Sequence, residues 1–301
     1  MDLDYSWNAL FRPGAATEYF DVVDPEPVRT DTTGFHATNA WWFAELSRLI
    51  YRQEFDEVGA RANGPRRPGI LEAANLRERR FVNRGGTQCA IVESQHVGGE
   101  MFGVLVFRGT STFGHWLSNL NTLPADWPEG GLVHRGFMEA LDKVWGDVDD
   151  CLSTMDCPMF YTGHSLGAAL ATLAASRSTR PPFAVYTFGS PRVGNSDFVA
   201  TLRNVAVYRV VNNRDVLPSV PPSQAPLYFC HAGELCQITA DNRMSVNTKG
   251  TTGAIEGEAS DPSLLADLGY PRRLYPLQSL ADHAPTNYVA RLERIMLQTG
   301  S

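Results

Sequence analysis

Residues 161–171 read Tyr-Thr-Gly-His-Ser-Leu-Gly-Ala-Ala-Leu-Ala and contain the pattern Gly163-x-Ser165-x-Gly167. An apolar run precedes the pattern and an alanine-rich run follows it, which predicts a strand that turns sharply into a helix at the serine. Such a turn holds the side chain out at the edge of a sheet in a strained conformation. The new helix also directs free N–H groups toward that point. Ser165 is therefore a candidate nucleophile, and a spectator serine in a structural turn is the alternative.

The composition bounds the class of protein. Hydrophobic residues make up 43% of the 301 residues and charged residues 20%, which is ordinary for a globular chain. The net charge of −7 and the lack of a clustered basic face argue against a nucleic-acid partner. No apolar stretch approaches the ~20 residues that a transmembrane helix needs. Any lipid contact would therefore be hydrophobic in origin, because an acidic protein is not attracted to anionic membranes.

The first residues give an expectation about location. The stretch 1–7 lacks both a basic region and an apolar core, so no secretory signal is visible. We expect a cytoplasmic protein from the sequence as written, and a secreted one if a leader has been removed. The five cysteines leave at least one unpaired and fit reduced thiols, although two local disulfides stay open for an exported chain.

Alternating strand and helix patterns predict an α/β fold. We expect strands at 88–96, 101–107, 159–162, 183–188 and 205–212, a short helix at 71–77, and a hairpin of 226–231 with 234–239 around Gly233. Helical patterns cover 39–58, 134–152, 165–177, 197–203 and 285–297. This order favours a mostly parallel sheet with helices on both faces. We expect an N-terminal arm over 1–34, one domain over 35–301, and a polar excursion at 240–261.

An activated serine needs an imidazole as its base. In α/β-hydrolases the order along the chain is Ser, then Asp or Glu, then His. Four histidines precede the serine turn, contrary to that order: His36, His96, His115 and His134. His164 lies within the turn with its side chain directed away from Ser165, and His231 follows an apolar run as a packed core residue. His283, just before the last helix, is the best candidate, against a helix-capping or surface role.

The acid of the site is predicted to be Asp215. It follows the strand at 205–212 at its carboxyl end, where the active sites of parallel sheets gather. A turn-initiating aspartate is the alternative. Asp197 and Asp282 are weaker candidates, because the first lies at a helix start and the second is too close to His283 in sequence to orient it easily.

Donors for a developing oxyanion can also be predicted. One is the backbone N–H of Leu166, directly after Ser165. The other is Thr110, which follows the strand at 101–107 and can donate through its N–H and its hydroxyl. Helix capping is the alternative role for Thr110.

Eight segments of the chain form a distinctive set: Asn39-Ala40, Phe107-Arg-Gly-Thr110, Trp116-Leu-Ser-Asn-Leu120, Val133-His-Arg-Gly-Phe137, Thr162-Gly-His-Ser-Leu-Gly-Ala168, Phe188-Gly-Ser-Pro-Arg-Val-Gly-Asn195, Asp215-Val-Leu-Pro218 with Pro221-Pro222, and His283. With these segments the chain resembles the class 3 lipases, the triacylglycerol lipase family of filamentous-fungal type. The segments run in family order over roughly 39–297 and are highly specific in combination.

The resemblance implies an α/β-hydrolase fold with Ser165, Asp215 and His283 as the triad and Thr110 with Leu166 as the oxyanion hole. It also implies an amphipathic lid over 112–120 that moves at a lipid–water interface, and core packing is the alternative for this stripe. The apolar residues of the segment are Phe113, Trp116, Leu117 and Leu120. The substrate would be a lipid or another hydrophobic ester.

The expected activity is carboxylic ester hydrolysis through an acyl-enzyme, most simply by a triacylglycerol lipase, with no metal and no organic cofactor. Feruloyl esterases and phospholipases belong to the same family, so the class of ester stays open. A silent α/β-hydrolase that binds a ligand, and a hydrolase of amides or thioesters, are further alternatives. The sequence leaves the oligomeric state open.

Overall fold

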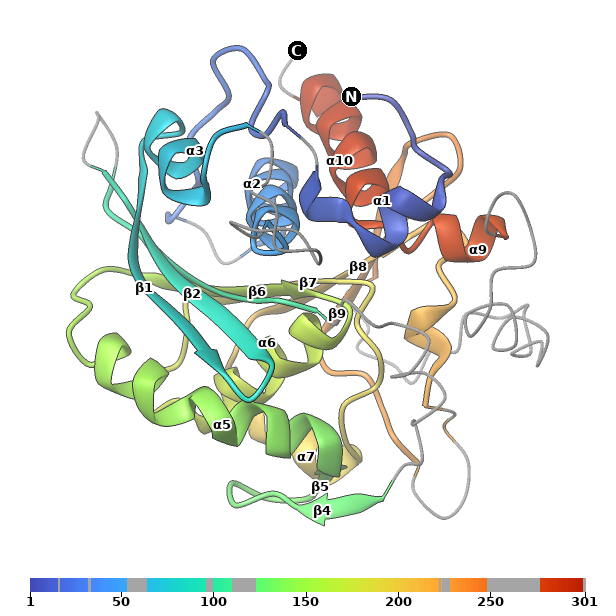
Figure 1. The fold of residues 1–301 in the computed structure, drawn as a ribbon. Helices are drawn as coiled ribbons and strands as arrows, with labels where there is room; N and C mark the ends of the chain where they lie inside the picture. The colour runs from blue at the N-terminus through green and yellow to red at the C-terminus, as the bar shows by residue number, and fades with distance from the viewer. Residues whose placement is uncertain are drawn as a thin grey trace.

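The computed structural model describes residues 1–15, 17–31, 34–52, 64–95, 100–109, 123–221, 223, 228–247 and 277–299. Within them, eight strands form one sheet in the order β1-β2-β3-β6-β7-β8-β9-β10, seen at the centre of Figure 1. Its strands are β1 (Leu76–Arg84), β2 (Thr87–Ser94), β3 (Gly103–Phe107), β6 (Met159–His164), β7 (Ala184–Phe188), β8 (Val207–Asn212), β9 (Glu234–Ile238) and β10 (Met244–Asn247). Strands β4 (Pro124–Asp126) and β5 (Leu132–His134) form a second, small sheet.

The middle of the large sheet is parallel. Strands β3, β6, β7, β8 and β9 pair in parallel, whereas β1, β2 and β10 add antiparallel edges. The central strands β3, β6, β7 and β8 are buried on both faces, which is the pattern of a parallel sheet between two helical layers. Their carboxyl ends meet at one edge of the sheet. The residues that follow β6, β7 and β8 are therefore brought together.

Helices cover both faces of the sheet. Figure 1 places α1 (Trp7–Phe11), α2 (Ala37–Leu49), α3 (Arg67–Ala73) and α10 (Pro285–Thr299) above it, and α5 (Arg135–Leu152), α6 (Leu166–Arg177) and α7 (Ser196–Thr201) below it. A short helix α9 (Gln278–Ala281) leads into α10, and two 3₁₀ turns complete the description, η1 (Pro13–Ala15) and η2 (Leu217–Ser219). Buried apolar clusters on the two faces form the core. The predicted fold class, a mostly parallel sheet with helices on both faces, is confirmed.

The helix predicted over 71–77 is wrong at its end, because α3 ends at Ala73. The arginine-rich stretch that follows lies in the edge strand β1. An edge strand can carry charge because one side faces water. Arg77 binds Glu93 on β2, and Arg80 binds Asp147 on α5. The charged residues make this stretch look unlike a strand in the sequence, although antiparallel pairing with β2 stabilises it as one.

The predicted hairpin around Gly233 is also wrong. Among residues 228–231, only Cys230 makes a bridge, and its partner is Gly194. Gly233 has φ +81°, and a Cβ there would overlap the backbone of Val207. The glycine therefore brings the chain close alongside β8, so that β9 pairs with β8 in parallel. The hairpin of this region joins β9 to β10, and the expected excursion at 240–261 begins with it.

The first residues of the chain pack against its last helix. The terminal amine of Met1 lies 2.7 Å from the Glu293 carboxylate, and the Asn287 side chain bonds both backbone groups of Asp4.

Among the described residues, no helix is both long and apolar enough to cross a membrane.

Candidate active site

Ser165 lies in the sharp turn between β6 and α6, as the sequence predicts. Its backbone angles are φ 59° and ψ −125°, a conformation that L residues rarely adopt. The N–H of Ser165 donates to the carbonyl of Phe188 at 2.9 Å, which anchors the turn to the end of β7. The residue is 1% exposed, and its hydroxyl has no hydrogen-bond partner within the described part of the chain. The turn therefore stores strain and presents an uncommitted hydroxyl.

Two glycines let α6 approach the sheet at this turn. A Cβ on Gly163 would overlap the backbone of Gly167, and a Cβ on Gly167 would overlap the carbonyl of Phe107 at the end of β3. The start of α6 is thereby pressed against the carboxyl ends of β3 and β6. Leu166 is the first residue of α6, so its N–H belongs to the group that helix geometry leaves without an intrahelical partner. An N–H in this position suits an oxyanion donor.

Asp215 and His283 are in direct contact. The His283 Nδ1 lies 3.0 Å and 2.8 Å from the two carboxylate oxygens of Asp215, and both residues are essentially buried. Asp215 follows β8, whereas His283 lies between α9 and α10, so the contact joins segments 68 residues apart. A carboxylate accepts from Nδ1–H, and the neutral ring then has its lone pair on Nε2. This is the tautomer that a general base next to a serine requires.

Tyr288 on α10 completes the surroundings of the carboxylate. Its hydroxyl donates to Oδ2 of Asp215 at 2.5 Å and accepts from the N–H of Asn212 at 3.1 Å. Burial raises the pKa of Tyr288, and the neighbouring Asp215 charge adds to this rise. The tyrosine therefore stays a hydroxyl donor. Tyr288 was not among the predicted site residues, because one tyrosine in an amphipathic helix matches no motif.

Gly189 shows how closely the parts of the site approach one another. It follows β7 with φ +58°, and a Cβ there would lie 2.6 Å from Asp215 Oδ2 and 2.7 Å from His283 Nδ1. The residue before it, Phe188, is the one that anchors the Ser165 backbone. The same stretch of chain thus touches the serine turn on one side and the acid–imidazole pair on the other.

A second contact joins the serine turn to His283. The Nε2 atom of His164 lies 2.7 Å from the carbonyl oxygen of His283, and the two imidazole rings are 4.4 Å apart. The structure therefore brings Asp215 and His283 into contact and places the residue beside Ser165 against His283.

The other candidate residues have different roles. Asp282 bonds Asn213 and the backbone of Arg214, and the N-cap of α7 is Asn195 rather than Asp197. His134 caps α5, and His36 precedes α2. His231 donates from Nε2 to the carbonyl of Pro218 at 2.8 Å, as a hydrogen-bonded residue would, but it is only partly buried and so does not lie in the core. The remaining histidines, His96 and His115, lie outside the described residues.

Five predicted site residues also lie outside the described part of the chain. They are the proposed oxyanion residue Thr110 and the four apolar residues of the expected lid: Phe113, Trp116, Leu117 and Leu120.

The described residues also include the possible metal ligands and the cysteines. No group of three or more His, Cys, Asp or Glu side chains that could hold a metal ion occurs among the described residues. All five cysteines, which lie within those residues, are free thiols.

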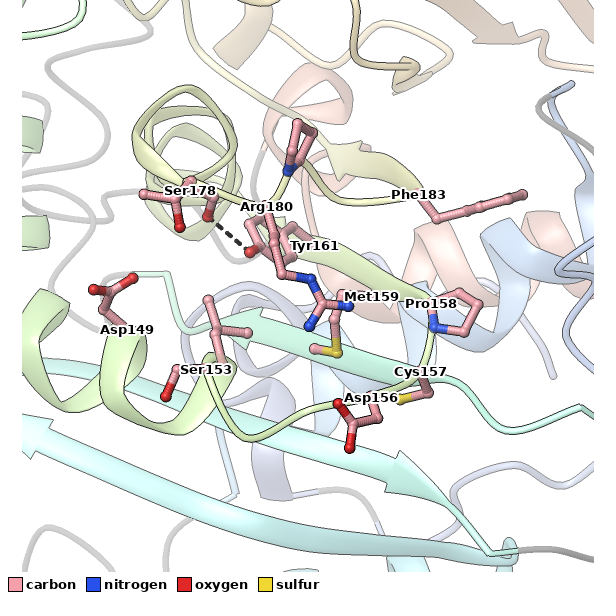
Figure 2. Close-up of a pocket in the computed structure, with 13 residues that line it drawn as sticks. Asp149, Ser153, Asp156, Cys157, Pro158, Met159, Tyr161, Ser178, Arg180 and Phe183 are labelled. Atoms are coloured by element: carbon pink, nitrogen blue, oxygen red, sulfur yellow. Dashed lines mark hydrogen bonds between the residues drawn. The ribbon is translucent and has the colours of Figure 1, made fainter.

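A pocket of about 410 Å³ lies at the other end of β6. Figure 2 shows that its walls come from the end of α5, the start of β6 and the chain after α6, with Tyr161 bonded to Ser178. Met159 lines it at the first position of β6, whereas Ser165 follows the last. This pocket is therefore separate from the candidate site.

Part of this chain is similar to a known family of proteins. The family described as "Lipase (class 3)" matches residues 104–225. The chain is 37% identical over 199 residues to the secreted mono- and diacylglycerol lipase 1 of Fusarium solani, which covers 60% of this chain and 58% of that protein. It is 33% identical over 159 residues to a lipase of Rhizomucor miehei, covering 47% and 43%. The chain thus spans about half the length of these curated relatives.

Solved structures agree. A triacylglycerol lipase described as having a serine protease triad at its catalytic centre matches with a TM-score of 0.54 and 26% identity, covering 70% of this chain and 80% of that one. Lipase II from Rhizopus niveus matches with a TM-score of 0.54 and 25% identity, covering 59% and 72%. The fold is that of the α/β-hydrolases. Within this fold, the chain is similar to the class 3 lipases, whose family model matches residues 104–225.

Proposed function

We propose that the protein is a serine carboxylic ester hydrolase that acts on lipid esters, most simply a triacylglycerol lipase. The observation that carries the proposal is the buried bond between Asp215 and His283 at the edge of the sheet where the strained turn of Ser165 lies. The names of the relatives, a mono- and diacylglycerol lipase and several lipases, support the class of substrate.

In the proposed mechanism, Ser165 attacks the ester carbonyl while Nε2 of His283 takes the hydroxyl proton. Asp215 holds the imidazole by Nδ1 and stabilises its cationic form. The N–H of Leu166, together with Thr110, would stabilise the tetrahedral oxyanion. The protonated imidazole then donates to the departing alcohol, and water repeats the sequence on the acyl-enzyme. The chain's own groups supply every proton transfer in this scheme.

The class of ester is tested by comparing substrates. We expect hydrolysis of p-nitrophenyl esters and of emulsified triacylglycerol, with Ser165→Ala as the inactive control that keeps its fold. Phospholipid belongs in the same comparison, because the chain is 35% identical over 148 residues to a protein named phospholipase A(1). Preference for phospholipid would replace the triacylglycerol assignment, whereas full activity of Ser165→Ala would refute the mechanism.

The oxyanion residue Thr110 and the lid are parts of the same proposal. If Phe113, Trp116, Leu117 and Leu120 form a lid, the rate should rise sharply once a long-chain ester exceeds its solubility limit. If the rate instead follows simple saturation kinetics across the solubility limit of the ester, these four residues are packing residues and do not form a lid. Thr110→Ala should lower kcat by roughly 10²-fold with little change in KM, because an oxyanion donor acts in the transition state.

The place of action is a further part of the proposal. One relative is named as secreted, which supports export, whereas the five free thiols fit a reducing compartment. Fractionation of the native host and detection of the protein in medium or in cytosol separates these two locations.

A further inference from the structure

We propose that His164 and Tyr51 are positioning residues of this site. They form one buried link, hereafter the Tyr51–His164 link, that ties the backbone of His283 to the loop at Gly109. The inference rests on the proposed function, because it assigns the link a part in ester hydrolysis. It concerns residues that touch no reacting atom and act through His283 and the loop.

The hydrogen-bond partners of His164 determine its tautomer. Its Nε2 lies 2.7 Å from the carbonyl oxygen of His283, and a carbonyl can only accept. The ring proton is therefore on Nε2, which leaves Nδ1 as an acceptor. The hydroxyl of Tyr51 lies 3.1 Å from this Nδ1 and donates to it. His164 is 3% exposed, so water has little access to either bond.

The other end of the link contacts the loop after β3. A Cβ on Gly109 would overlap the Tyr51 hydroxyl, and it would lie 2.7 Å from the carbonyl oxygen of His164. The backbone of Gly109 also hydrogen-bonds to Tyr51. Gly109 directly precedes Thr110, the predicted oxyanion residue. The link therefore joins the loop that leads to the predicted oxyanion donor with the backbone of the predicted base.

The surroundings keep both members of the link neutral. Burial, followed by the nearby His283, lowers the pKa of His164 well below its ordinary value. Burial also raises the pKa of Tyr51, although the Arg108 guanidinium, 5.5 Å from its ring, opposes this. Tyr288 packs edge-on against His164 at 5.9 Å. The imidazole of His164 thus stays uncharged beside the one that must accept a proton.

Neutrality matters because of the short distance between the two rings. The proposed mechanism puts a positive charge on His283, and a second cation with its ring centroid 4.4 Å away would oppose that charge. A neutral histidine with its proton on Nε2 avoids the repulsion and still donates to the His283 carbonyl. This bond fixes the position of His283 relative to the serine turn. The position matters because catalysis is sensitive to displacements on the order of 1 Å.

Three variants test the link by kinetics. His164→Leu removes both bonds, His164→Gln keeps an N–H donor for the His283 carbonyl, and Tyr51→Phe removes only the hydroxyl. We expect kcat on a soluble p-nitrophenyl ester to fall at least about 10-fold in His164→Leu and Tyr51→Phe with KM nearly unchanged. His164→Gln should restore a large part of the loss relative to His164→Leu.

The matched control is Tyr161→Phe. It also removes one tyrosine hydroxyl from a buried residue, but that hydroxyl bonds Ser178 at the far end of β6. Its kcat should equal that of the wild type. A folded Tyr51→Phe with wild-type kcat would overturn the inference, even if His164→Leu failed to fold.

An independent readout needs no activity. Nitrogen NMR of the imidazoles in the full protein should show His164 neutral, with its proton on Nε2, at a pH near 6.5, where an ordinary histidine is half protonated. A protonated ring or a proton on Nδ1 at this pH would overturn the link. If the wild type hydrolyses no ester and no fluorophosphonate labels Ser165, the proposed function fails instead. The NMR result then still decides the structural part of the inference.

Discussion

Single residues at the edge of the sheet decide whether the site can form, and Gly189 is the most sensitive of them. A Cβ at this position would crowd both Asp215 and His283, and φ +58° is unfavourable for alanine. We expect Gly189→Ala to lower kcat on a p-nitrophenyl ester by more than about 100-fold because it displaces the imidazole. Gly146→Ala is the matched control, since no heavy atom lies within 4 Å of its added Cβ. Equal activity in both variants would contradict this account of the site.

His134 gives a prediction about pH. Its Nδ1 accepts from the N–H of Gly136 at 3.1 Å, and burial lowers the pKa of His134 to about 4. The pKa of His134 in the folded protein lies below the ordinary value near 6.5. The neutral form of His134 therefore stabilises the fold fully above pH 6.5, and this contribution is lost as the pH falls toward 4. Protonation of His134 as the pH falls through this range should lower the free energy of unfolding by roughly 3 kcal/mol.

The variant His134→Ser keeps a capping side chain but does not titrate. Urea unfolding of both proteins at pH 7 and pH 4.5 isolates the effect of His134, since His164 and His231 titrate in both. The wild type should lose more stability than the variant over this interval. Equal losses would show that His134 is not buried in the neutral form.

The candidate site was predictable at the residue scale where a motif or an order along the chain existed. Ser165 has its flanking glycines, Asp215 follows a strand, and His283 comes last. Tyr288 contacts Asp215 and Tyr51 contacts His164 only in the folded chain, so no local sequence pattern identifies either tyrosine. His164 was predicted to point away from Ser165, but its partners, Tyr51 and the carbonyl of His283, were not predicted.

At the scale of elements, the predictions succeeded for buried segments and failed at the edges of the sheet. The strands β3, β6, β7 and β8 are buried throughout and mostly apolar, and such apolar runs are visible in the sequence. The strand β1 contains four consecutive charged residues, 77–80, and most of its residues are not buried, and β10 is mostly exposed. Their pairing depends on neighbours distant in sequence, which single-sequence patterns do not record.

Helix α7 owes its start to one side chain. The Asn195 side-chain oxygen accepts from the N–H of Phe198 at 3.1 Å and from the N–H of Leu132 at 2.9 Å, which ties α7 to β5. We expect Asn195→Ala to lower the free energy of unfolding by about 1–3 kcal/mol, because two N–H groups lose their acceptor. Asn195→Asp keeps the acceptor and should lose much less, as measured by urea denaturation. A larger loss in Asn195→Asp than in Asn195→Ala would contradict this explanation.

Across the whole molecule, the start of the chain is held by the helix that follows the predicted base. The fully buried Asn287 bonds the N–H and the carbonyl of Asp4 and also the carbonyl of Ala281, just before His283. The division into an arm over 1–34 and a domain over 35–301 stays a prediction. The contact joins Asp4, within the predicted arm, to the helix that follows His283.

This contact predicts coupling between the arm and activity. Asn287→Ala should lower the melting temperature, speed proteolysis within residues 1–12 and reduce kcat several-fold, because the residues flanking His283 lose a partner. Glu293→Gln, which removes only the terminal ion pair, should change stability by less than about 1 kcal/mol. Unchanged proteolysis in Asn287→Ala would contradict the coupling.

The most direct test of the central claim is labelling with a fluorophosphonate followed by peptide mass spectrometry. The claim is that a buried carboxylate and imidazole activate the serine in the strained turn. We predict one stoichiometric adduct on Ser165 in the wild type, none in Ser165→Ala, and labelling slowed by at least about 10³-fold in His283→Ala. An adduct on another residue, or a labelling rate in folded His283→Ala equal to that of the wild type, would contradict the claim.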